Sequence, residues 1–125
     1  RLSHALKAAR GPRLAVWPFD HVTPGSPGGL AMVLVEIFPS YYFHAAGMNP
    51  EKNAAADPAF MNAALAAYGS EGVGQDYAPR GADADEADAI ISAAALRYFA
   101  GRPGCWHAPH EAAQEGWIFG VPPVT

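Results

Sequence analysis

Glu36 is the single acid in an otherwise apolar run, Met32–Phe38. A continuous apolar run of this length is typical of a strand that is covered on both faces. An ionised carboxylate buried in such a strand is costly unless a cation, hydrogen bonds or a metal ion compensates its charge. The pattern therefore makes Glu36 a candidate functional carboxylate. The plain alternative is an exposed strand end, or an ion pair with Arg13 or Arg97.

A second acidic group, Asp85-Glu86-Ala87-Asp88-Ala89, lies at the start of the longest expected helix, 83–100. Residues three apart on a helix face the same way, so Asp85 and Asp88 can converge on one ligand. The plain alternative is helix capping, because acids in a first turn favour the positive end of the helix dipole and Asp83 with Glu86 resembles a capping box.

Asp88 fits the capping alternative less well than its neighbours. At about 100° per residue it lies in line with Ile91 and Ala95, at the margin of the apolar stripe of the helix. A strand-borne Glu36 together with Asp85 and Asp88 would suit Mg²⁺ or Mn²⁺, which prefer oxygen ligands and leave waters free for substrate phosphates. Two such ions suit phosphodiester hydrolysis.

Weaker candidates lie near the C-terminus of the sequence. Cys105, His107 and His110 offer a thiol and two imidazoles, but a structural zinc site usually has four ligands. Cys105 with a neighbouring histidine as its base is a second possibility, although residues so close together in a loop rarely hold that geometry. Aromatic side chains such as Trp17, Trp106 and Trp117 could stack on bases, and core packing or loop anchoring is the plainer expectation.

These residues must be positioned by short alternating elements. The pattern predicts an α/β domain, because single strands alternate with helices that have one apolar stripe. Glycine or proline residues mark most of the element ends. The expected helices are 4–10, 39–46, 58–68 and 83–100, the expected strands are 14–17 and 32–38, and 116–121 is a terminal strand or a strap over the core.

Composition excludes several classes of protein. The chain has 125 residues, which predicts a single domain, 1–125, and its formal net charge of −4 disfavours a basic nucleic-acid coat protein. With one cysteine, no internal disulfide is possible, and a cytoplasmic location is the default expectation. No apolar run is long enough for a membrane span, so we expect no membrane partner. No Walker-type phosphate loop and no dinucleotide fingerprint occur.

Three segments together resemble a known family. Val33–Ser40, Asp85–Ala89 and Glu115–Val121 look like the uncharacterised bacterial family of predicted RNase H-like nucleases, and Trp17-Pro18-Phe19-Asp20 fits as well. The Asp-x-x-Asp-Ala pattern is also similar to RuvC-type resolvases of the same ribonuclease H-like superfamily. The resemblance spans nearly the whole chain and rests on no single specific motif.

The resemblance implies an RNase H-like fold, in which a mixed sheet is packed by helices. It implies catalytic and metal-binding roles for Glu36, Asp85 and Asp88, with Mg²⁺ or Mn²⁺ as cofactor and nucleic acid as partner. The family's first catalytic aspartate lies on an N-terminal strand that has no counterpart here. The chain would then be the C-terminal portion of such a domain, with an open sheet edge through which it could form a homo-oligomer.

The leading functional hypothesis is therefore a metal-dependent phosphodiesterase or nuclease, and inactivity of this fragment for want of the missing carboxylate stays an open alternative. The negative charge and the capping explanation of the acids favour a non-catalytic structural or protein-interaction module instead. A small-molecule phosphohydrolase or phosphotransferase is the third hypothesis, which a comparison of nucleic acid with free nucleotides would separate from the first.

Overall fold

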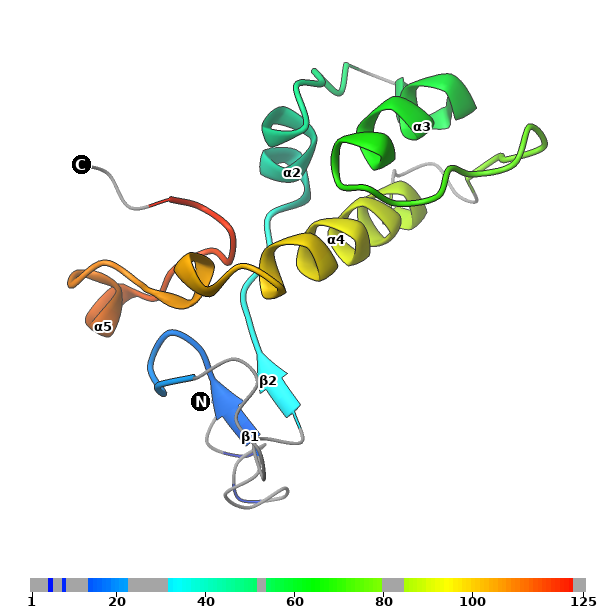
Figure 1. Ribbon diagram of the computed structural model, residues 1–125. Helices are drawn as coiled ribbons and strands as arrows, with labels where there is room; N and C mark the ends of the chain where they lie inside the picture. The colour runs from blue at the N-terminus through cyan, green and yellow to red at the C-terminus, as the bar shows by residue number, and fades with distance from the viewer. Residues whose placement is uncertain are drawn as a thin grey trace. The chain divides into compact units, whose positions relative to one another are not determined.

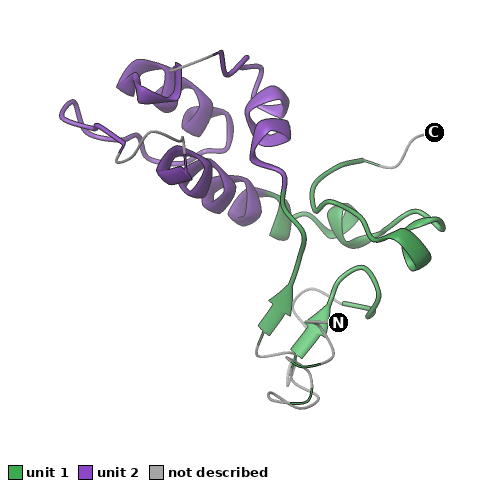
Figure 2. Ribbon diagram, turned by 180° about the vertical axis from the view of Figure 1, so that it is seen from behind, with its two compact units in different colours: residues 1–37, 99–125 green, residues 38–98 purple. Residues whose placement is uncertain are grey.

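The computed structural model describes Ala5, Ala8 and residues 14–22, 32–51, 54–79 and 85–122. They fall into two units, unit 1 with residues 1–37 and 99–125 and unit 2 with residues 38–98 (Figure 2). The expected α/β class is confirmed: the described residues form a two-stranded parallel sheet and four α-helices. Apart from Ala5 and Ala8, the helix expected at 4–10 lies outside the described residues, as do Arg13 and Asp83.

The sheet of unit 1 consists of β1 (Leu14–Val16) and β2 (Met32–Leu34), which run parallel with Ala15 opposite Val33 (Figure 1). β1 ends as predicted, because Pro18 has no N–H to donate to a ladder. The Trp17–Pro18 peptide bond is cis. The described sheet is thus parallel, and the mixed sheet expected from the family resemblance is not seen in it.

The chain beyond β2 continues to pair, but with a different segment. Glu36 forms an isolated parallel bridge with Ile118, and the Phe119 N–H donates to the Glu36 carbonyl at 2.9 Å. The Leu34 carbonyl accepts from the Trp17 N–H at 3.0 Å. Carbonyls two residues apart in an extended chain point to the same side. β1 and the 118–119 segment therefore follow one another along the same edge of residues 32–36.

The expectation of a strand at 32–38 covered on both faces is wrong. β2 is only three residues long, and Met32 and Leu34 are 44% and 36% exposed. Side chains two apart in a strand share a face, and Glu36 is exposed like Met32 and Leu34. The argument from the cost of burying Glu36 therefore fails, and the plain alternative of an exposed carboxylate near the strand end is correct.

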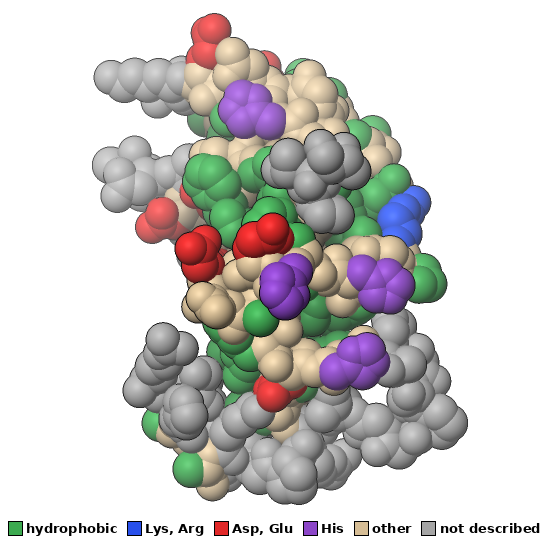
Figure 3. All heavy atoms as spheres, turned by 90° about the vertical axis from the view of Figure 1, so that its left-hand side faces the viewer, with side chains coloured by type: hydrophobic (Ala, Val, Ile, Leu, Met, Phe, Trp, Pro, Cys, Tyr) green, Lys and Arg blue, Asp and Glu red, His purple; other side chains and the backbone are tan. Residues whose placement is uncertain are grey.

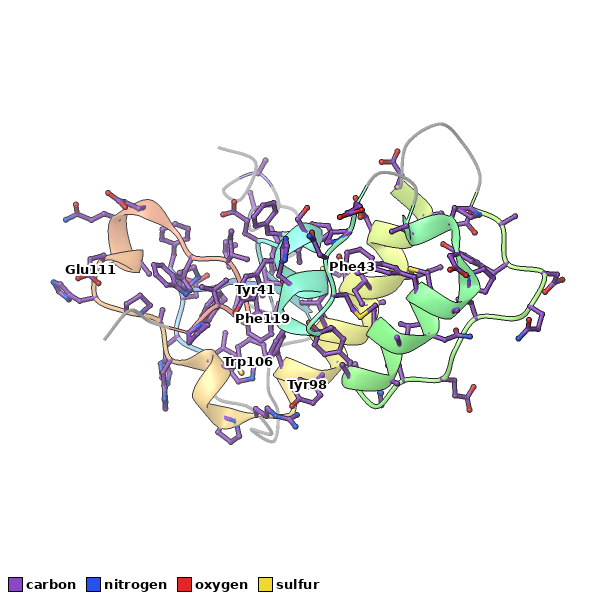
Figure 4. The ribbon with its side chains drawn as sticks, turned by 90° about the horizontal axis from the view of Figure 1, so that it is seen from above. Tyr41, Phe43, Tyr98, Trp106, Glu111 and Phe119 are labelled. Carbon is purple, nitrogen blue, oxygen red and sulfur yellow. The ribbon has the colours of Figure 1, made fainter. Side chains whose placement is uncertain are left out.

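An aromatic cluster forms the core of unit 1. The ring centroids of Trp17 and Phe119 are 5.2 Å apart at 89°, and those of Trp106 and Phe119 are 4.6 Å apart (Figure 4). The edge-to-face contact of Trp17 with Phe119 adds to the burial energy of the two rings. Trp106 ends the short 3-10 helix η3 (Pro103–Trp106), which precedes α5 (Ala112–Glu115).

Unit 2 holds the helices predicted from the sequence: α2 (Pro39–Ala45), α3 (Pro58–Ala67) and α4 (Asp85–Ala100), whose last two residues belong to unit 1. The short 3-10 helix η2 (Ala54–Ala56) precedes α3. α3 begins as expected, because the Asp57 carboxylate accepts from the Ala59 N–H at 2.9 Å and Pro58 is the first helical residue.

The helices of unit 2 share one buried core. α2 contributes Tyr42 and Phe43, α3 contributes Met61 and Leu65, and α4 contributes Ala87, Ile91 and Ala95. The apolar stripe predicted for α4 is thereby confirmed. At the other end of α4, the Arg97 guanidinium donates to the carbonyls of Tyr68 and Gly69 and to the Ser70 hydroxyl, at 2.8–3.3 Å. No helix among the described residues is long and apolar enough to cross a bilayer.

Candidate functional site

Asp85 and Asp88 lie on the first turn of α4, as predicted. Asp85 is exposed and Asp88 is partly buried. Burial raises the pKa of the Asp88 carboxyl, and the neighbouring negative charge of Asp85 raises it further. The negative charge of Asp85 is thus felt at Asp88, and whether the two carboxylates converge on one ligand stays a prediction.

The direction of this pKa shift separates Asp88 from an ordinary capping acid. A carboxylate that is stabilised by the positive end of a helix dipole has a lowered pKa, because the dipole favours the charged form. The pKa of Asp88 is shifted in the opposite direction, by burial and by the charge of Asp85. A cation placed between Asp85 and Asp88 would favour the charged form of Asp88 and would lower its pKa.

Two hydroxyl groups near these acids were not singled out from the sequence. Ser92, one helical turn after Asp88, is buried, and its Oγ has no hydrogen-bond partner among the described residues. The hydroxyl of Tyr77 is also buried and has no hydrogen-bond partner among the described residues. Burial and the negative charge of Glu86 raise the pKa of Tyr77. Ser92 is a single polar residue in an alanine-rich part of α4 and Tyr77 lies in a loop, so no periodic pattern could have identified either.

Glu36 lies in unit 1, on the wall of a pocket of about 300 Å³ that is formed with residues 115–118 and Val121. A second carboxylate, Glu115, lines the same pocket and was missed by the sequence analysis. Gly116, at a φ of +85°, passes beside the acid: a Cβ on this glycine would stand 3.7 Å from Glu36 Oε2. Glycine at this position therefore lets the backbone take a left-handed turn close to the carboxylate.

The three predicted acids thus divide between the units, with Glu36 in unit 1 and Asp85 with Asp88 in unit 2. Each is described within its own unit. Among the residues that the structure describes, no group of three or more His, Cys, Asp or Glu side chains could hold a metal ion. The pair Asp85–Asp88 and the pair Glu36–Glu115 are therefore the two acidic arrangements to be explained.

Cys105 lies in η3, and His107 and His110 lie in the segment that joins η3 to α5. The Cys105 thiol is partly buried, and this burial raises its pKa more than the charge of Arg102 lowers it. A nucleophilic cysteine requires a lowered pKa, because the thiolate is the reactive form. The direction of the shift argues against the nucleophile hypothesis.

The tryptophans anchor backbone, in agreement with the plainer expectation for them. The indole N–H groups of Trp17, Trp106 and Trp117 donate to the carbonyls of Trp106, Ala100 and Val121 at 3.0, 3.0 and 2.8 Å. Trp17 is also buried.

Comparisons with protein-family models, with curated proteins and with solved structures find no match to this chain.

Proposed function

We propose that the chain is part of a metal-dependent phosphodiesterase of the RNase H-like type, with nucleic acid as its substrate class. Asp85 and Asp88, both in unit 2, bind Mg²⁺ or Mn²⁺. The observation that carries the proposal is the position of Asp88, which lies partly buried near the negative charge of Asp85 on the first turn of α4. The three-part resemblance of the sequence supports the reaction type.

The donor set fits these ions. Mg²⁺ is usually held by one or two carboxylates together with waters and substrate phosphates, rather than by a full cage of protein ligands. The Asp85–Asp88 pair meets this requirement without a third protein ligand in unit 2. When bound, the ion would lower the pKa of a coordinated water and stabilise charge on the phosphate.

The first experiment measures thermal unfolding with and without Mn²⁺. A ligand that binds the native state stabilises it by about 3 kcal/mol when present at roughly 100 times its Kd. We expect Mn²⁺ to raise the Tm of the wild type but not of Asp88→Asn or Asp85→Asn. Glu86→Gln is the matched control, because it removes the same charge from the same turn and should keep the response.

The second experiment measures Mn²⁺-dependent hydrolysis of bis(p-nitrophenyl) phosphate and of a short single-stranded oligonucleotide. Asp88→Asn should abolish hydrolysis, while Glu86→Gln should not. Equal Tm shifts in all variants, together with no hydrolysis by the wild type, would refute the proposal. That result would favour the non-catalytic interaction module.

A further inference from the structure

A second pocket, of about 390 Å³, opens in unit 1 between two loops. One wall is the segment after β1, residues 17–22, and the other is residues 106–110 with Ala113 of α5. Two tryptophans, two prolines and Phe19 supply flat apolar surface, while three histidines and Asp20 supply the polar groups. The volume lies within the range of about 300–1,000 Å³ that small-molecule pockets occupy.

Hydrogen bonds and a ring contact hold both walls in place. The Trp17 indole donates to the Trp106 carbonyl at 3.0 Å, which joins one loop to the other, and the two rings meet edge to face at 6.4 Å. Asp20 Oδ2 accepts from the Val16 N–H at 2.8 Å, so the carboxylate is tied to the end of β1. The pocket is therefore largely formed before any ligand enters.

The chemistry of the lining suits a planar heteroaromatic ring. Such a ring has apolar faces, which aromatic side chains can stack on, and polar edges, which imidazole nitrogens can meet as donors or acceptors. Phe19 is the aromatic wall that remains available, because it is 50% exposed whereas Trp17 is buried. The histidine side chains of the described residues reach the surface, as Figure 3 shows.

The charge of the lining argues for a base rather than a phosphate inside the pocket. Among the described residues of the lining, Asp20 is the single Asp, Glu, Lys or Arg. A negative carboxylate repels a phosphate and tolerates a neutral ring.

The pocket also adjoins Glu36. Phe19 Cζ and Glu36 Oε2 stand 3.6 Å and 3.7 Å from the same point, the position that a Cβ on Gly116 would take. A ring stacked on Phe19 would therefore lie on the same side of unit 1 as Glu36.

We propose that this pocket binds an unpaired purine or pyrimidine base, stacked on Phe19 and met at its edge by His107 and His110. The choice of a nucleobase among planar heteroaromatic rings rests on the proposed function. The base is recognised without a metal ion, and its sugar and phosphate remain outside the pocket.

The test measures binding of adenosine, adenosine 5′-monophosphate and ribose 5-phosphate to the full chain in the presence of EDTA, by quenching of tryptophan fluorescence. We expect similar affinities for the first two ligands and none for the third. Loss of one stacking contact corresponds to about tenfold weaker binding. Phe19→Ala should show this loss, and Phe38→Ala, which truncates a phenylalanine that is also 50% exposed but does not line the pocket, should not.

A second pair of variants tests the edge contacts. His110→Ala should weaken adenosine binding, whereas His44→Ala, an exposed histidine of α2 outside the pocket, should leave it unchanged. Equal losses in Phe19→Ala and Phe38→Ala would overturn the proposal, as would absence of binding or tight binding of ribose 5-phosphate. Adenosine binding, with equal Mn²⁺-induced Tm shifts in all the acid variants and no hydrolysis, would support the pocket and refute the proposed function. Hydrolysis without adenosine binding would do the reverse.

Discussion

Replacement of Tyr68 by Phe should destabilise unit 2 near neutral pH and cease to do so in alkali. The Tyr68 hydroxyl donates a buried hydrogen bond to the Tyr42 carbonyl, which also accepts from the Ala46 N–H. Because that carbonyl keeps a partner in the variant, the loss is that of one net hydrogen bond, about 1 kcal/mol. Burial, reinforced by the neighbouring tyrosines, raises the pKa of Tyr68 to about 12.

The sign of the pH dependence follows from this shift. In the unfolded chain the phenol ionises near pH 10, whereas in the folded protein it stays protonated up to about pH 12. Its contribution to stability is therefore complete below pH 10 and is lost as the pH rises towards 12. One pKa unit corresponds to about 1.4 kcal/mol, so the wild type loses roughly 1 kcal/mol through Tyr68 at pH 11, and Tyr68→Phe does not.

The measurement is urea unfolding at about pH 8 and about pH 11, followed by far-UV circular dichroism. We expect the destabilisation in Tyr68→Phe to shrink from about 1 kcal/mol to near zero between these values. Tyr98→Phe is the control, because it removes a hydroxyl from a tyrosine that is only partly buried. The Tyr98 ring contacts the Tyr68 ring edge to face, with the ring centroids 5.4 Å apart. An equal cost of Tyr68→Phe at both pH values would show that burial does not raise this pKa in the folded protein.

Two further substitutions test local geometry. Asp57→Ala should lower the free energy of unfolding by about 1 kcal/mol because it removes the side-chain cap of α3, and Asp57→Ser should restore most of it in the same urea titration. Gly120→Ala should destabilise unit 1 far more than Gly47→Ala destabilises unit 2. Both glycines have a positive φ, so both variants carry the same kind of backbone strain. A Cβ at position 120 would in addition clash with the Phe99 ring, whereas a Cβ at position 47 would meet nothing within 4 Å. Similar Tm losses in the two variants would contradict this reasoning.

The helices were predictable because their signals are local. Asp57-Pro58 and the spacing of Met61 and Leu65 define α3 without reference to the rest of the chain. Gly47 and Gly69 mark the ends of α2 and α3 and do have the positive φ that a helix end favours. Since each of these signals acts within one turn, tertiary contacts did not override them.

The strand around Glu36 was predicted less well because strand burial is not a local property. An apolar run is the same in sequence whether or not another element covers it, and Met32 and Leu34 are exposed on the side that Glu36 shares. The association of Glu36 with Glu115 depends on the Glu36–Ile118 bridge, which joins segments 82 residues apart. No spacing rule links such residues.

The loops of unit 1 illustrate how a chain rich in glycine and proline can still build a defined pocket. A sheet of two three-residue strands supplies few backbone hydrogen bonds, so the remaining polar groups must be satisfied in other ways. Three indole N–H groups fill this role, each donating to a carbonyl of the same unit. Because those tryptophans are committed to the backbone, stacking on a ligand in the larger pocket falls to Phe19, which has no such hydrogen bond to make. Trp17→Ala should therefore disrupt the fold of unit 1 as well as the pocket. Phe19→Ala should weaken ligand binding and leave the fold of unit 1 intact.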